Sequence, residues 1–161
     1  DFAYIMARQF LFDVYQFFFL EALTESKDET LAALAQKSLK EVTYHLRRST
    51  QWMYRLGDGT EVSHIKIQAA INHLWMYKDE LFFMDETDEE MIKAGVGVDL
   101  NAVQEKWNER IQEVFTKATL TLPEMPVYSL EYGKNGHHTD HMGYILLDIQ
   151  YLNNKYPDAK W

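Results

Sequence analysis

Apolar and polar residues follow one another along this chain in the three- and four-residue steps of α-helices. Only seven glycines and three prolines occur among its 161 residues, so long segments run without the residues that end helices. The pattern predicts an all-α fold with five helices and one short helical turn, without a linker that would divide residues 1–161 into domains. The helices are expected at residues 2–24, 28–56, 60–84, 99–118 and 139–155. The short turn, capped by Thr87 and Glu90, is expected to end near Gly95.

The first predicted helix is apolar nearly all round, a pattern typical of a helix that is buried on most sides. Gln9, Asp13 and Gln16 interrupt it at steps of four and three, so they form one narrow polar stripe. A buried carboxylate at Asp13 needs a partner. The favoured interpretation is a basic residue from elsewhere, and the alternative is a metal ion. The candidate basic residues are Arg8, Arg47, Arg48 and His45.

The second predicted helix has a seam of residues spaced alternately four and three apart, as in helical bundles. The seam comprises Leu31, Ala35, Ser38, Val42, His45, Ser49, Trp52 and Leu56. Ser26 and Glu29 have the spacing of a capping box at its start. Gly57 and Gly59 supply the backbone freedom that ends it.

Apolar faces also define the next two helices. The third is expected to turn Ile67, Ile71, Leu74, Leu81 and Phe82 inward. The fourth begins at the N-cap Asp99, and its apolar face comprises Val103, Trp107, Ile111, Val114 and Phe115. An irregular stretch follows at 120–137. It is long for a loop in a compact domain, which suggests a contact role, and a short strand is conceivable at Val127–Leu130.

Charge and composition exclude several classes of function. The net charge of −9 disfavours nucleic acid and anionic membranes as partners. The chain contains no cysteine, which excludes disulfides and thiol catalysis. Its most apolar stretch is interrupted by Asp13, Gln16 and Glu21, so no membrane-spanning segment is expected. It also contains no glycine-rich nucleotide loop and no nucleophile elbow.

The second helix carries the first candidate for metal chemistry. Di-iron bundle proteins place a Glu and a His three residues apart so that both point to the bundle axis. Here Val42 stands three residues before His45, and Glu41 stands four before it. The favoured interpretation of His45 is a core histidine that is satisfied by a neighbouring carboxylate. The alternative is a metal site.

The stretch from His137 to His141 is the second candidate. It contains three histidines and Asp140 within five residues, and His138 and His141 lie three apart. Asp140 has its own explanation as a residue that stabilises a helix N-terminus. A structural metal normally needs three or four converging ligands, so His138 and His141 form a weak alternative metal site.

Three stretches together resemble one known family. They are residues 2–13 (FAYIMARQFLFD), residues 40–48 (KEVTYHLRR) with 55–61 (RLGDGTE), and residues 138–144 (HTDHMGY) with 150–152 and 156–157. All three are similar to the C subunits of bacterial phenylacetyl-CoA ring epoxidases. The likeness runs over essentially the whole chain, which resembles the C-terminal part of those longer subunits. The first helices of their bundle are therefore expected outside it.

The resemblance implies a ferritin-like fold and a place in a multicomponent monooxygenase of phenylacetate breakdown. In that system a related A subunit carries the di-iron centre and binds the CoA thioester, while an NADPH-fed reductase supplies electrons. The C subunit is the inactive partner. By this resemblance Val42 replaces a ligand glutamate, His45 remains, and Asp13 is a second altered ligand position.

The resemblance thus predicts a non-catalytic, cytoplasmic chain without metal, cofactor or catalytic residues. Its expected partners are the catalytic di-iron A subunit and other epoxidase subunits, with no nucleic acid and no membrane. The alternative is a di-iron or mononuclear metal oxygenase in its own right that uses Asp13, Glu41 and His45 with residues of the first helices expected outside the chain.

Overall fold

The computed structural model describes residues 1–124 and 133–160, and every regular element in them is helical. The elements are α1 (Phe2–Leu23), α2 (Glu29–Gly57), α3 (Glu61–Leu74), the 3₁₀ helix η1 (Trp75–Phe82), α4 (Glu86–Ala94), α5 (Leu100–Lys117), the 3₁₀ helix η2 (Gly133–Asn135) and α6 (His141–Lys155). The all-α prediction is confirmed. The strand considered at Val127–Leu130 lies outside the described residues. No helix in the described ranges has the length and apolarity needed to cross a membrane.

Two compact units make up the chain, residues 1–129 and residues 130–161. The single-domain organisation therefore stays a prediction. In the second unit the described elements are η2 and α6, and no residue of α6 is buried. The last helix begins at His141, two residues later than its predicted start at Thr139.

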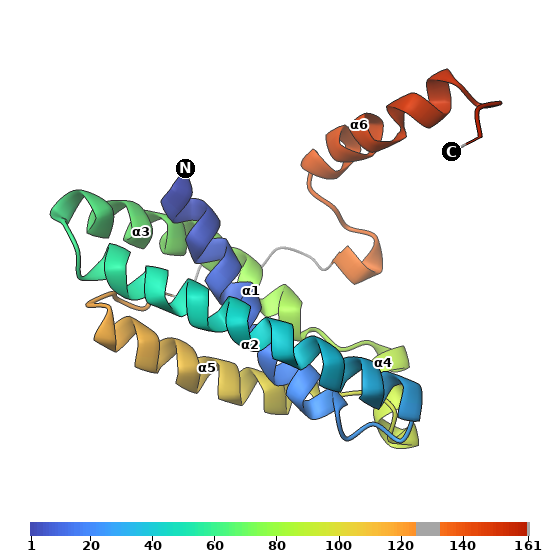
Figure 1. Cartoon of the computed structure of the whole chain (residues 1–161), viewed down its shortest axis with the longest axis horizontal. Helices are drawn as coiled ribbons and strands as arrows, with labels where there is room; N and C mark the ends of the chain where they lie inside the picture. The colour runs from blue at the N-terminus through green and yellow to red at the C-terminus, as the bar shows by residue number, and fades with distance from the viewer. Residues whose placement is uncertain (125–132, 161) are drawn as a thin grey trace. The chain divides into compact units, whose positions relative to one another are not determined.

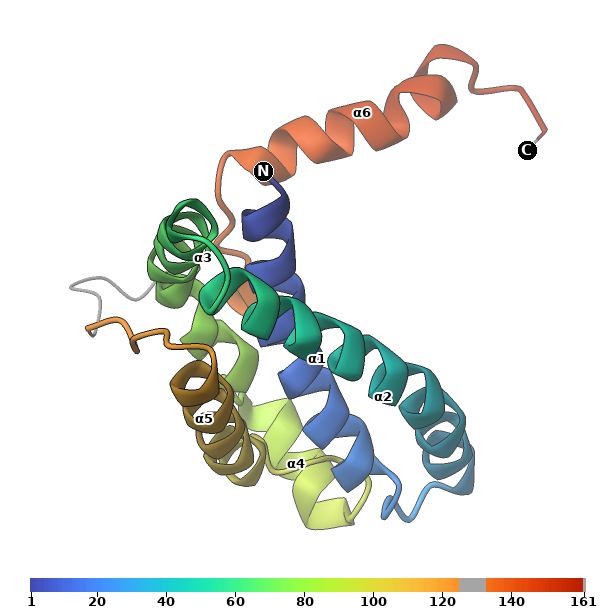
Figure 2. The ribbon, with the colours of Figure 1, turned by 60° about the vertical axis from the view of Figure 1, so that its left-hand side comes forward.

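The first unit is a helical bundle of the kind that the ferritin-like class uses. Helix α1 packs against α2, α3 and α5, and Figures 1 and 2 show it between them. The predicted inner face of α5 is confirmed, because all five of its residues are at most 2% exposed. Phe10 and Val14 of α1 are fully buried in the same core. This packing fixes the shared face of α1 and α2, where the candidate chemistry lies.

The start of α2 differs from the prediction. Asp28 caps this helix, and its carboxylate accepts hydrogen bonds from the backbone N–H groups of Thr30 and Leu31 at 2.9 and 3.0 Å. The predicted capping box of Ser26 and Glu29 is wrong. The Ser26 hydroxyl instead donates to the carbonyl of Val96, 70 residues along the chain, at 2.9 Å. The cap of α2 therefore lies two residues later than the predicted box.

The α4 cap also differs. The short helical segment is a full helix that Asp85 and Asp88 cap reciprocally, rather than Thr87 and Glu90. In contrast, the predicted N-cap of α5 is confirmed, because the Asp99 carboxylate accepts from the Asn101 N–H at 2.9 Å.

The third predicted helix is wrong in its second half. The α-helix ends at Leu74 and continues as the tighter 3₁₀ helix η1. Both ends of η1 contact the ring of Trp107 on α5, since the ring centroids of Trp75 and Phe82 lie 5.7 and 5.5 Å from it. These ring contacts, which the local pattern does not contain, accompany the change of helix type.

Candidate functional site

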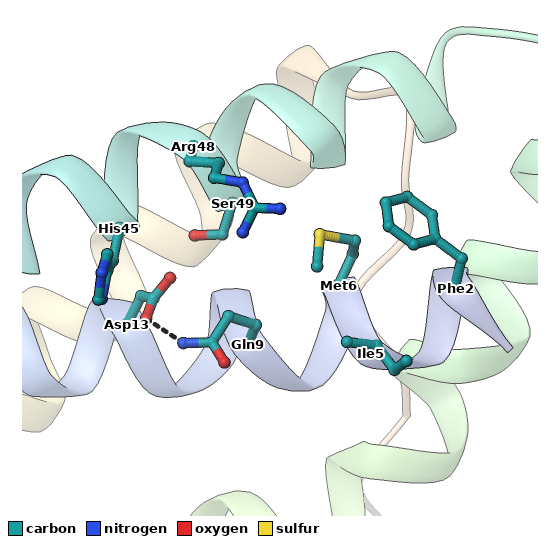
Figure 3. A pocket seen from close by; sticks show the side chains of 8 residues that line it. All are labelled: Phe2, Ile5, Met6, Gln9, Asp13, His45, Arg48 and Ser49. Atoms are coloured by element: carbon teal, nitrogen blue, oxygen red, sulfur yellow. Dashed lines mark hydrogen bonds between the residues drawn. The ribbon is translucent and has the colours of Figure 1, made fainter.

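A half-open pocket of about 450 Å³ lies between α1 and α2. We call it the α1–α2 pocket, and Figure 3 shows its lining side chains. It brings together Asp13 and His45, two of the residues that the sequence singled out. Helix α1 contributes Phe2, Ile5, Met6, Gln9 and Asp13, and α2 contributes His45, Arg48 and Ser49.

Asp13 is the buried charge of the pocket. It is 0% exposed, as its place in an apolar helix predicted. Its Oδ1 accepts a hydrogen bond of 2.6 Å from the side-chain amide of Gln9, one turn earlier on α1. Its Oδ2 has no hydrogen-bond partner within the described ranges. One carboxylate oxygen is therefore buried and unsatisfied, which costs free energy.

The predicted basic partner of Asp13 is wrong. Neither His45 nor Arg48 bonds to Asp13, although both line the pocket. The neutral amide of Gln9 takes the place of the expected cation. The sequence did contain this signal, because Gln9 and Asp13 belong to one stripe and lie four residues apart on a helix.

His45 lies at the edge of the pocket and not in the core. Its side chain is 44% exposed, and its Nε2 lies 3.9 Å from Glu41 Oε1, whose side chain is 77% exposed. Glu41 is therefore a neighbour of His45 at a distance too long for a hydrogen bond. The predicted burial of His45 is wrong. The predicted seam of α2 is confirmed at Ala35, Val42 and Ser49, which are buried. Leu46 and Met53 are buried in place of His45 and Trp52.

Val42 lies one turn before Leu46 and is 4% exposed. It occupies the buried position at which a Glu three residues before His45 would stand in a di-iron bundle. Its isopropyl group supplies no ligand atom. Within residues 1–124 and 133–160, no three His, Cys, Asp or Glu side chains converge as a metal site requires. The donor set around Asp13 and His45 therefore does not fit a di-iron centre.

The histidine stretch of the second unit is exposed. His138 precedes α6 in a non-helical segment, while His141 is the first residue of the helix. They do not share a helix face as the predicted start at Thr139 implied. The Asp140 side chain makes no capping hydrogen bond to α6. This arrangement gives no support to a metal site at His138 and His141.

The fold defines an all-α chain of the ferritin-like bundle class. The family model described as "Phenylacetic acid catabolic protein" matches residues 1–161, and the chain belongs to this family. The chain is also 40% identical over 161 residues to the C subunit of the 1,2-phenylacetyl-CoA epoxidase of Escherichia coli (strain K12). That match covers all of this chain and 64% of the relative, so the chain spans less than two thirds of the relative's length.

Proposed function

We propose that this chain belongs to a non-catalytic subunit of a phenylacetyl-CoA 1,2-epoxidase. The protein works in phenylacetate catabolism in the cytoplasm, where it supports a catalytic di-iron subunit. It binds that subunit and other subunits of the complex, and an NADPH-dependent reductase supplies electrons to the partner's iron. The likeness to the C subunit of an epoxidase and the family membership support this role.

The observation that carries the proposal is the buried Val42. A di-iron bundle takes a carboxylate at this position of its Glu-x-x-His motif, and here the position holds an aliphatic side chain with 4% exposure. A single missing bridging carboxylate removes ligand atoms from both metals. The chain then contributes structure to the complex, and the partner contributes the oxygen chemistry.

The test is the iron content of the natural protein, purified alone and loaded with ferrous iron without oxygen. The proposal expects well under one iron per chain by elemental analysis, and no epoxidation of phenylacetyl-CoA by this protein alone. Epoxidation is expected to appear when the catalytic subunit and reductase are added, and to fall when this protein is left out. About two irons per chain, the content of a di-iron bundle, would overturn it.

A second candidate function is a metal-dependent oxygenase in its own right. It rests on the unsatisfied Asp13 Oδ2 in a pocket that His45 also lines. Asp13, Glu41 and His45 would contribute ligands together with residues outside this chain, since these three do not converge on one point by themselves. Stoichiometric metal together with oxygen-dependent turnover in the absence of any partner would favour it over the structural role.

A further inference from the structure

The α1–α2 pocket contains a hydrogen-bond acceptor that no described residue of the first unit uses. Asp13 is 0% exposed, and Gln9 contacts only its Oδ1. Its Oδ2 has no partner in the part of the chain that the structure describes. An ionised carboxylate accepts at both oxygens and only accepts. A group that presents N–H donors to Oδ2 would therefore remove the cost of burying it.

The rest of the pocket favours a cation on an aliphatic stem. Phe2, Ile5 and Met6 form its apolar end, and Asp13 with Gln9 forms its polar end (Figure 3). Long basic groups use both kinds of surface, since their methylene stems lie on apolar side chains while their charged heads find a carboxylate. The volume of about 450 Å³ is ample for such a group.

A metal ion fits the same carboxylate less well. In protein metal sites three or four ligands converge on the ion. No group of three or more His, Cys, Asp or Glu side chains is placed in this way in the described ranges. A guanidinium or ammonium group brings its own donors and needs one carboxylate. The pocket offers that one.

The nitrogen donors that line the pocket do not meet this need in the structure. Arg48 and His45 line the pocket from α2, but neither donates to Asp13 Oδ2. His45 lies nearest to Glu41, at 3.9 Å. Arg48 lines the pocket, so its positive charge repels an incoming cation. It is also the side chain that an incoming cation has to displace or avoid.

We propose that the α1–α2 pocket binds a protonated aliphatic amine or guanidinium group, with its nitrogen donating to Asp13 Oδ2 and its stem on Phe2, Ile5 and Met6. The group has two conceivable sources with the same chemistry. One is the Lys or Arg side chain of a polypeptide segment outside these 161 residues, and the other is a free small molecule. This inference is independent of the proposed epoxidase role.

The first test is a titration of the 161-residue chain with n-butylguanidinium chloride, followed by NMR of the glutamine side-chain amides. The expected result is a saturable shift of the Gln9 amide, because Gln9 shares the Asp13 carboxylate with the probe. N-butylurea, which has a similar shape and no charge, is expected to cause no saturable shift. An equal response to both compounds, or none to butylguanidinium, would overturn the proposal.

Matched variants locate the binding. Asp13→Asn is expected to weaken it at least about tenfold, since a charged hydrogen-bond pair is lost. Glu105→Gln removes an exposed carboxylate of α5 and is expected to bind as the unaltered chain does. If Asp13→Asn does not fold, Arg48→Met carries the test. Removing this like charge from the pocket is expected to tighten binding, and unchanged or weaker binding would overturn the proposal.

A photo-crosslinking amino acid at Ile5, which is 58% exposed, then identifies the source in the natural protein. A polypeptide source gives a cross-linked peptide with a Lys or Arg within one helical turn of the link, and Asp13→Asn lowers its yield several-fold. A free source gives an amine or guanidine that co-purifies, is released on denaturation, and is absent from Asp13→Asn. A cross-linked peptide without a basic residue, or neither product, would contradict the proposal.

Discussion

The indole N–H of Trp107 on α5 donates a hydrogen bond of 3.0 Å to the backbone carbonyl of Leu11 on α1. The two residues are 96 positions apart, and Trp107 is 1% exposed. The bond joins the helix that carries Asp13 to the helix that forms the opposite side of the core. Since the indole has a single donor, this contact also fixes the orientation of the Trp107 ring against Trp75 and Phe82.

Trp107→Phe is expected to lower the free energy of unfolding by about 2 kcal/mol. The change removes the buried hydrogen bond and leaves a small cavity in the core. Trp75→Phe, in the neighbouring ring of the same cluster, is the control, and a smaller loss is expected because its described contacts are with rings and with Lys78. Urea unfolding of both variants measures the difference. Equal losses would show that the Leu11 bond contributes nothing.

Gly57→Ala is expected to destabilise the first unit by about 2 kcal/mol, because overpacking moves backbone or neighbours. A Cβ at Gly57 would lie 2.2 Å from the backbone oxygen of Ala118. Gly143→Ala on α6 is the matched control, since nothing lies within 4 Å of its added Cβ. That control is expected to be neutral or slightly stabilising, because alanine favours helix. The melting temperatures of the two variants are compared by thermal unfolding. A Gly57→Ala variant as stable as the unaltered chain would contradict the close approach of Gly57 to the Ala118 backbone.

Asp28→Ala is expected to cost about 1 kcal/mol, the usual value for loss of an N-cap. The backbone N–H groups of Thr30 and Leu31 donate to the Asp28 carboxylate, so their hydrogen exchange should become faster in this variant. Ser26→Ala is the comparison. It removes the bond to Val96 and should leave these two amides protected. If Ser26→Ala exposed them instead, the cap would lie where the sequence pattern placed it.

Val42→Glu is expected to lower the free energy of unfolding by about 2 kcal/mol or more without metal, because it places a carboxylate at a position that is 4% exposed. Val42→Leu keeps the site apolar and should cost about 1 kcal/mol. The informative measurement is the melting temperature with and without ferrous iron under nitrogen. A rise with iron in Val42→Glu alone would indicate a former ligand position. A rise in the unaltered chain would oppose the structural role.

The Glu113 carboxylate on α5 offers a pH test. Its hydrogen bond of 2.7 Å from Lys117, followed by the charges of Lys117 and Arg110, lowers its pKa. Lys117→Met should therefore raise the Glu113 pKa toward its ordinary value in an NMR titration. Because the folded-state pKa is the lower one, any stability from the pair is present above the ordinary Glu pKa and is lost as pH falls through the lowered value.

The same pair responds to salt. Both side chains are exposed, so added salt screens their attraction and should move the Glu113 pKa toward its ordinary value in the unaltered chain. Lys117→Met should show a smaller salt response. A Glu113 pKa that changed with neither the mutation nor salt would rule out the ion pair.

The sequence determined the helical class and most helix positions. Apolar spacing depends only on the period of the helix, and the inner face of α5 and its N-cap Asp99 lie where that period puts them. The sequence also predicted the start of α1 and the burial of Asp13, and it contains the apolar residue Val42. These are properties of neighbouring residues along one chain.

Tertiary packing decided the rest. The 3₁₀ continuation of α3 is accompanied by ring contacts with the distant Trp107. The Ser26 hydroxyl donates to the distant Val96 carbonyl, and His45 lines a pocket against α1. A helical period places His45 within one residue of the core, and one residue rotates a side chain by about 100°. Only the packing of α2 on α1 therefore determined that Leu46 turns inward, and that His45 lines a pocket beside a buried carboxylate.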